Sequence, residues 1–248
     1  MSQILKVVET RNEVQMILYT NIRITDHDNL EVRRQKRALR KSVSRYLRSK
    51  RRCIEALIQH NFTTDDYYCT LTFSDERYPD KGRNANFKFS YFMRMLRRNG
   101  CRNLRYLKVL EFRHGAGRYH FHVVLSGDGL TGDLISEIWG RTYGYARVRR
   151  LMPWKVPGLA AYLAKEAPDI VGGRAYSRSL PPSGLADPVI TWETVPDEYR
   201  MVVPYGCDLI EREPRCENAY GSVETLSYLL PAGQPTKQFY KTLGLKKT

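Results

Sequence analysis

The 248-residue chain lacks several features that would place it in common protein classes. It has no apolar run near the ~18 residues that a membrane span requires, and its opening, Met1 to Ile4, does not read as a secretory signal. Its five cysteines are odd in number and contain no C-x-x-C pair, which argues against a structural zinc cluster. We therefore expect a cytoplasmic protein with reduced thiols and no membrane partner.

Acidic residues are scarce relative to basic ones, with 26 Asp and Glu against 41 Lys and Arg. The formal net charge of +15 and a sequence pI near 9.7 predict a polyanionic partner, and nucleic acid is favoured over a membrane surface. Eleven of the basic residues lie between Arg33 and Arg52, a segment that contains no acid. Removing these eleven charges from +15 would leave +4, so most of the excess lies in one stretch.

The surrounding stretch, from about Leu30 to Ile58, is predicted to be a helix because apolar residues recur in it at spacings of four and seven. Charge runs of this kind often form a solvated helix face. Because the basic segment holds no acid of its own to balance the cations, contact with a phosphate backbone is favoured. The residues predicted to bind DNA are Arg33, Arg34, Lys36, Arg37, Arg40 and Lys41, together with Arg147 and Arg149 on a later strand.

Beyond this stretch, the chain alternates between strand and helix patterns. Strands are predicted at 67–73, 105–113, 118–125 and 144–150, and helices at 87–98, 131–140 and 158–167. Asn86 is the expected N-cap of the first of these helices, and Gly100 is expected to follow its end. The alternation is typical of an α+β fold in which an antiparallel sheet carries helices on one side, as in the split βαβ plan.

Histidine is rare, yet three of the five histidines lie between residues 114 and 122. In the predicted strand, His120 and His122 share one face because side chains two apart point the same way. A hairpin loop from His114 to Gly117 would place Glu111 opposite His120, with their Cβ atoms roughly 5 Å apart. Two polar residues facing solvent would give the same pattern. The added carboxylate favours a divalent metal site with open coordination positions.

About forty residues later, Tyr162 and Lys165 lie three positions apart on one face of the last predicted helix. A tyrosine in a helix is ordinarily a packed aromatic residue, and a lone Y-x-x-K carries little weight. Its position after the carboxylate and the two histidines makes Tyr162 a candidate nucleophile toward phosphorus. Such a reaction requires a metal to polarise the phosphate and a nearby cation to ease loss of the hydroxyl proton.

Three motifs in this order resemble those of the rolling-circle replication initiators, the histidine-hydrophobe-histidine (HUH) endonucleases: Tyr68 to Phe73, His120-Phe121-His122, and Tyr162 to Lys165. The resemblance covers residues 62–182. It implies a five-stranded antiparallel sheet and an enzyme that nicks single-stranded origin DNA and becomes linked to its 5′ phosphate. Carried over to this chain, it implies His120, His122 and Glu111 as ligands of Mg²⁺ or Mn²⁺, Tyr162 as the nucleophile and Lys165 as its helper.

The chain departs from the family pattern in two respects. Glu166 stands where two-tyrosine members have a second tyrosine, so a single-tyrosine nickase and strand transferase is expected. No G-x-x-x-x-G-K-[ST] phosphate loop is present, so unwinding is expected from a separate helicase acting with the host replication machinery. The sequence leaves an oligomer possible.

The expected organisation is an N-terminal segment with the basic helix at 1–61, the HUH endonuclease domain at 62–182 and a C-terminal accessory region at 183–248. An HUH single-strand transposase would need the same residues, and flanking DNA would distinguish it from an initiator. A relaxase is disfavoured because the tyrosine follows the histidines. A non-catalytic nucleic-acid-binding domain would have no need for the carboxylate, the two histidines and the tyrosine together.

Overall fold

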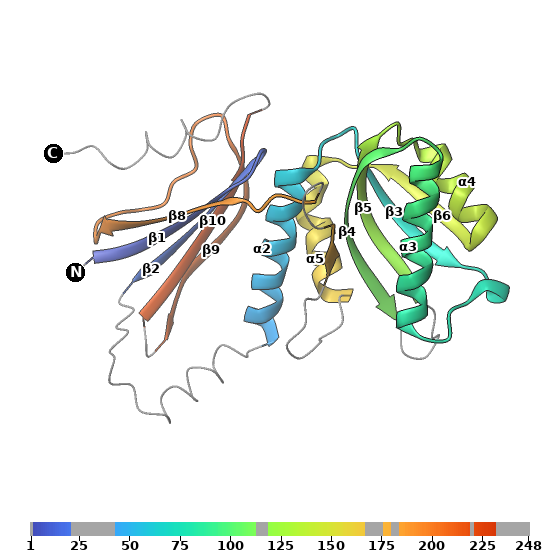
Figure 1. The fold of residues 1–248 in the computed structure, drawn as a ribbon. Coiled ribbons are helices and arrows are strands. Elements are labelled where there is room, and N and C mark those ends of the chain that lie inside the picture. Colours follow the sequence, from blue (N-terminus) through green and yellow to red (C-terminus); the bar gives the residue numbers. More distant parts are fainter. Residues whose placement is uncertain are drawn as a thin grey trace. The chain divides into compact units, whose positions relative to one another are not determined.

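The computed structural model describes residues 2–20, 43–112, 119–166, 176–179, 184–218 and 221–231. The chain divides into two compact units, a terminal unit of residues 1–60 and 187–248 and a central unit of residues 61–186. Each unit is built on an antiparallel sheet of five strands, and four α-helices lie in the described residues (Figure 1). The expected α+β fold with a five-stranded antiparallel sheet is confirmed. None of the helices in these ranges combines the length and the hydropathy that crossing a bilayer would require.

The sheet of the terminal unit joins the two ends of the chain. Its strands are β1 (Ser2–Glu9), β2 (Glu13–Thr20), β8 (Val189–Pro196), β9 (Asp208–Asn218) and β10 (Gly221–Leu229), in the order β8-β1-β2-β10-β9. One face packs an apolar core that includes Val7, Met16 and Leu226. Helix α2 (Val43–Asn61) lies against the other face, where the Arg52 side chain bonds Glu213 and Thr225. The segments expected at 1–61 and 183–248 therefore both contribute strands to one sheet.

The central unit carries the three motifs. Its strands are β3 (Tyr67–Phe73), β4 (Arg102–Phe112), β5 (Tyr119–Asp128), β6 (Gly144–Arg150) and β7 (Ser177–Arg178), in the order β6-β3-β5-β4-β7. Helices α3 (Gly82–Arg98) and α4 (Gly132–Thr142) cover one face, where Phe89 and Trp139 pack with Phe121. Helix α5 (Val156–Glu166) lies on the opposite face (Figure 1). The expectation that all helices share one side was wrong, because Tyr162 on α5 contacts the face opposite this core.

Helix α3 begins earlier than the sequence pattern predicted. Its first residue is Gly82, and the backbone N–H of Asn84 and of Ala85 donates to the carbonyl of Lys81. Ala85 is fully buried and extends the apolar face by one turn, so glycine and asparagine residues that resemble a loop are held in the helix by packing. Asn86 is not the N-cap. Its side chain lies inside the helix and donates to the carbonyl of Gly82.

The ends of α4 and the start of β6 depend on local backbone chemistry. Thr131 caps α4 as predicted, since its hydroxyl accepts from the backbone N–H of Leu134 at 3.2 Å. Gly140, expected to end the helix, lies inside it. Gly144 has φ +150°, and a Cβ there would lie 2.4 Å from the Ser74 nitrogen. A glycine is therefore required where β6 turns to pair with β3.

The basic helix is described only in part. Helix α2 begins at Val43, whereas the sequence predicted a start near Leu30, and residues 30–42 lie outside the described residues. The short turns of 3₁₀ helix, Asp75–Arg77 and Pro153–Lys155, follow β3 and precede α5.

Candidate metal centre and tyrosine

The candidate site is built on rows of side chains that run across the sheet of the central unit. Glu111 on β4 pairs with His120 on β5, which confirms the predicted register. His122, two residues further along β5, pairs with Thr70 on β3. Thr70 in turn pairs with Arg147 on β6. Because alternate strand residues face the same way, these side chains all lie on the face opposite the α3 and α4 core.

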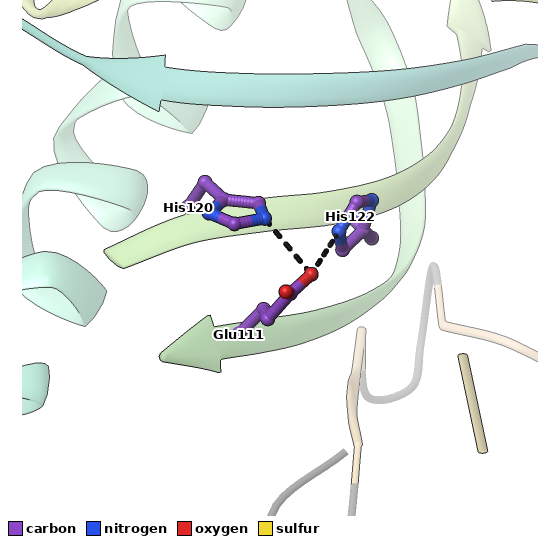
Figure 2. A group of neighbouring side chains, drawn as sticks. All are labelled: Glu111, His120 and His122. Carbon is purple, nitrogen blue, oxygen red and sulfur yellow. Dashed lines mark hydrogen bonds and ion pairs between the residues drawn. The ribbon is translucent and has the colours of Figure 1, made fainter. Parts of the chain in front are cut away.

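The carboxylate of Glu111 contacts both imidazoles (Figure 2). One carboxylate oxygen, Oε2, lies 2.8 Å from His120 Nε2 and 2.7 Å from His122 Nε2. Glu111 is 1% exposed and His122 is 3% exposed, whereas His120 is half-buried at the edge of the cluster. The site thus has a buried base and one partly accessible side.

The three side chains form a donor set that fits a metal ion. Each offers one ligand atom, and these atoms lie within 4.8 Å of one another. Two imidazole nitrogens and one carboxylate oxygen suit a divalent ion and leave coordination positions open for water or a phosphate oxygen. A carboxylate with 1% exposure has little access to water, so a cation between it and the imidazoles would offset the cost of its burial.

His122 is held through its second ring nitrogen as well. The Tyr68 hydroxyl lies 2.8 Å from His122 Nδ1, and the Thr70 hydroxyl lies 3.5 Å from the same atom. The Tyr68 and His122 rings are nearly parallel, with centroids 6.2 Å apart. Burial raises the pKa of the Tyr68 hydroxyl, which keeps it protonated near neutral pH. These contacts fix the orientation of the imidazole.

Helix α5 brings Tyr162 to the same cluster. The Tyr162 hydroxyl donates to Glu111 Oε2 at 3.1 Å and lies 3.2 Å from His122 Nε2. Its ring meets that of His122 edge to face, with centroids 5.0 Å apart. Leu163 and Ala164 are buried beside it, whereas Lys165, one turn after Tyr162, is exposed. Tyr162 therefore faces the candidate metal site, and Lys165 stands at the solvent side of the helix.

A groove of about 510 Å³ opens above the cluster. Its lining includes His120, His122, Tyr162 and the two strand arginines, Arg147 and Arg149. Both arginines are exposed on β6. The groove thus presents cations beside the imidazoles and the tyrosine hydroxyl, as a phosphodiester would require.

The remaining predicted DNA-binding residues, Arg33, Arg34, Lys36, Arg37, Arg40 and Lys41, lie outside the described residues. The described end of the same basic run is partly neutralised within the terminal unit. Arg51 lies 3.1 Å from Glu211 and 3.5 Å from Glu55, and Arg52 bonds Glu213. These acids come from outside the basic segment, so the lack of acids inside it did not predict them.

Tyr68 and Thr70 were recognised as part of a strand motif and not as site residues. The signal that could have found them is the alternation of β3, since both share the face of His122 across the strand pair. The sequence does not determine which of the side chains on that face reaches the second ring nitrogen.

The comparisons with known proteins agree with this location of the site. Residues 66–168 match the model of a family described as replication-associated protein ORF2, a range that includes the carboxylate, both histidines and the tyrosine. No curated protein and no solved structure matches the chain. The family match supports a replication initiator.

Proposed function

We propose that the protein is a metal-dependent nickase and strand transferase that acts on single-stranded origin DNA and starts rolling-circle replication. The observation that carries this proposal is the position of Tyr162, whose hydroxyl lies 3.1 Å from Glu111 Oε2 and 3.2 Å from His122 Nε2. A tyrosine that served only packing would have no reason to reach two atoms of a candidate metal site. The match of residues 66–168 to a replication-associated family supports the same conclusion.

Glu111, His120 and His122 would hold the ion, for which Mg²⁺ and Mn²⁺ suit the mixed oxygen and nitrogen ligands. A divalent ion at this position supplies charge that polarises the phosphate and stabilises the negative charge that develops during transfer. The exposed guanidinium groups of Arg147 and Arg149 line the same groove and would bind neighbouring phosphates.

Tyr162 is the proposed nucleophile. Its phenolic oxygen forms a bond to phosphorus, the bond between phosphorus and the 3′ oxygen breaks, and the 3′ oxygen takes up a proton and leaves as a hydroxyl. The product is a 5′ phosphotyrosine that keeps the phosphoester, so the reverse reaction can rejoin the strand. Lys165, the cation one turn away on α5, is proposed to ease loss of the tyrosine proton.

The test is formation of a covalent adduct. Wild-type protein incubated with labelled single-stranded DNA and Mn²⁺ should form an adduct that peptide mass spectrometry maps to Tyr162. Tyr162→Phe should abolish the adduct and retain DNA binding, because it removes one oxygen and keeps the ring. Tyr145→Phe is the matched control, since Tyr145 is 68% exposed on β6 and should react like wild type.

Two results would contradict the proposal. One is an adduct that maps to Tyr145, Tyr176 or another tyrosine, which would overturn the choice of nucleophile. The other is undiminished cleavage in excess chelator, which would remove the metal from the reaction.

A further inference from the structure

An exposed aromatic pair lies on the sheet of the terminal unit. Trp192 on β8 is 58% exposed, and its ring stacks with that of Tyr19 on β2 at a centroid distance of 6.0 Å and an interplanar angle of 23°. Lys6 on β1 pairs with Trp192 in the sheet, and its Nζ lies 5.2 Å from the Trp192 ring centroid. We call these three residues the aromatic platform.

A cationic groove adjoins the aromatic platform. It has a volume of about 610 Å³ and is lined by Lys6 and Tyr19 of the platform and by Arg48, Arg52 and Arg215. Four cationic side chains line it against one acid, Glu213. Glu213 is occupied by ion pairs with two of the arginines, at 3.4 Å from Arg48 and in direct contact with Arg52. The lining therefore carries an excess of positive charge.

The exposure of Trp192 is unusual for a side chain of its size, and the same strand exposes Ile190 and Val189 by about half. A face that is both apolar and cationic matches one chemistry well. Nucleobases of a single strand offer flat faces that stack on aromatic rings, and the phosphates between them pair with Lys and Arg. In a duplex the base faces are covered by their neighbours, so only the cations of the groove would be satisfied.

We propose that the aromatic platform and its groove form a second binding site for single-stranded DNA, separate from the residues of the candidate metal centre. Trp192 and Tyr19 stack bases, and Lys6 and Arg215 contact the phosphates. The site does not depend on the chemistry of Tyr162. It would hold the strand that is displaced or delivered during replication without cutting it.

The test uses the full-length chain without added metal, so that a failure of the nicking chemistry does not affect it. Trp192→Ala should weaken the affinity for oligo(dT) by about 5- to 150-fold, which is the range measured when one stacking aromatic is removed. The affinity for duplex DNA should change little. Tyr205→Ala is the matched control, because Tyr205 is a fully exposed aromatic residue of the same unit that stands outside the platform, and this substitution should have no effect.

A local measurement separates this site from DNA contacts elsewhere in the chain. In a Trp154→Phe background, the remaining tryptophans are buried Trp139 and exposed Trp192. Saturating oligo(dT) should quench the emission, and Trp192→Ala should remove the quenching. Lys6→Gln should lower the slope of log affinity against log salt by about 0.7. Unchanged emission at saturating oligo(dT) would overturn the proposal and would indicate that this face serves a protein partner or a second copy of the chain.

Discussion

His122 is the residue that fixes the geometry of the candidate site, because it is bonded at both ring nitrogens. Nε2 faces Glu111 and Tyr162, and Nδ1 faces the hydroxyl of Tyr68 at 2.8 Å. If Nε2 binds a metal, Nδ1 carries the ring proton and donates it to the Tyr68 oxygen. Tyr68 is thus a positioning residue that acts on the ion through His122.

This role predicts a loss of metal affinity when the hydroxyl is removed. Tyr68→Phe should weaken Mn²⁺ binding by about 10- to 100-fold, the usual effect of removing a partner of a metal-bound histidine. Titration calorimetry without DNA measures this directly. Thermal unfolding of the metal-free variant should match wild type, since the ring and its packing remain. Equal Mn²⁺ affinity in the two proteins would show that Tyr68 does not orient the imidazole.

At the scale of elements, Lys108 connects α3 to the sheet from an unusual position. It lies on the core face of β4, is 6% exposed, and its Nζ lies 4.5 Å from the Phe89 ring and 4.7 Å from the Phe121 ring. Its ammonium group donates to the side chain of Asn86 on α3. Burial lowers the pKa of Lys108 to about 8, because the charged form is poorly solvated in this position.

The lowered pKa gives a prediction for the pH dependence of stability. A lysine in the unfolded chain has a pKa near ~10.4, so between about pH 8 and that value the unfolded state binds more protons and the free energy of unfolding rises with pH. Below pH 8 the full cost of the buried charge is present. Lys108→Met should therefore stabilise the protein at pH 7 by about 1–3 kcal/mol, and the gain should shrink at pH 9.5.

Urea unfolding at the two pH values measures the effect. Lys81→Met is the control, because Lys81 is exposed at the start of the same helix and its substitution should give no such gain. A Lys108→Met variant that is less stable than wild type at pH 7 would mean that the ring contacts and the bond to Asn86 outweigh the cost of burial.

Elements with local signals were predictable from the sequence. The bounds of β3 and β6 were predicted to the residue, and the hairpin spacing placed Glu111 opposite His120. Local signals failed where packing decides. The start of α3 depends on burial of Ala85, and the sequence pattern does not show that α5 lies on the opposite face from α3 and α4.

Pairing between distant segments was the other part that the sequence did not predict. Ile4 pairs with Thr194, and no periodicity in either strand points to the other. The metal cluster was accessible because its three members lie within twelve residues on two adjacent strands. Tyr68 was not singled out, since its contact with His122 joins strands separated by the whole of α3 and β4.

At the scale of the whole molecule, the number of nucleophiles limits how many DNA ends one chain can hold. Two tyrosines of the described residues contact His122, and they do so at opposite edges of the imidazole. Tyr162 lies 3.2 Å from Nε2, the atom that would bind the ion, whereas Tyr68 lies 2.8 Å from Nδ1 on the far edge of the ring. Of these two, Tyr162 is therefore the one placed to attack a phosphate that the ion holds.

Glu166 occupies the position one turn after Tyr162 where a second nucleophile would stand, and a carboxylate does not form a comparably stable link to DNA. One chain should thus carry one DNA end at a time, and a second transfer made while the first end is still attached should require a second chain. Intact-mass analysis of the protein incubated with two oligonucleotides of different mass should find chains with either adduct and none with both. Tyr68→Phe should leave this ratio at one or fewer adducts per chain, and mixing wild type with Tyr162→Phe should not restore double transfer. Chains carrying both oligonucleotides would show that a second side chain acts as a nucleophile, and the mass of the modified peptide would identify it.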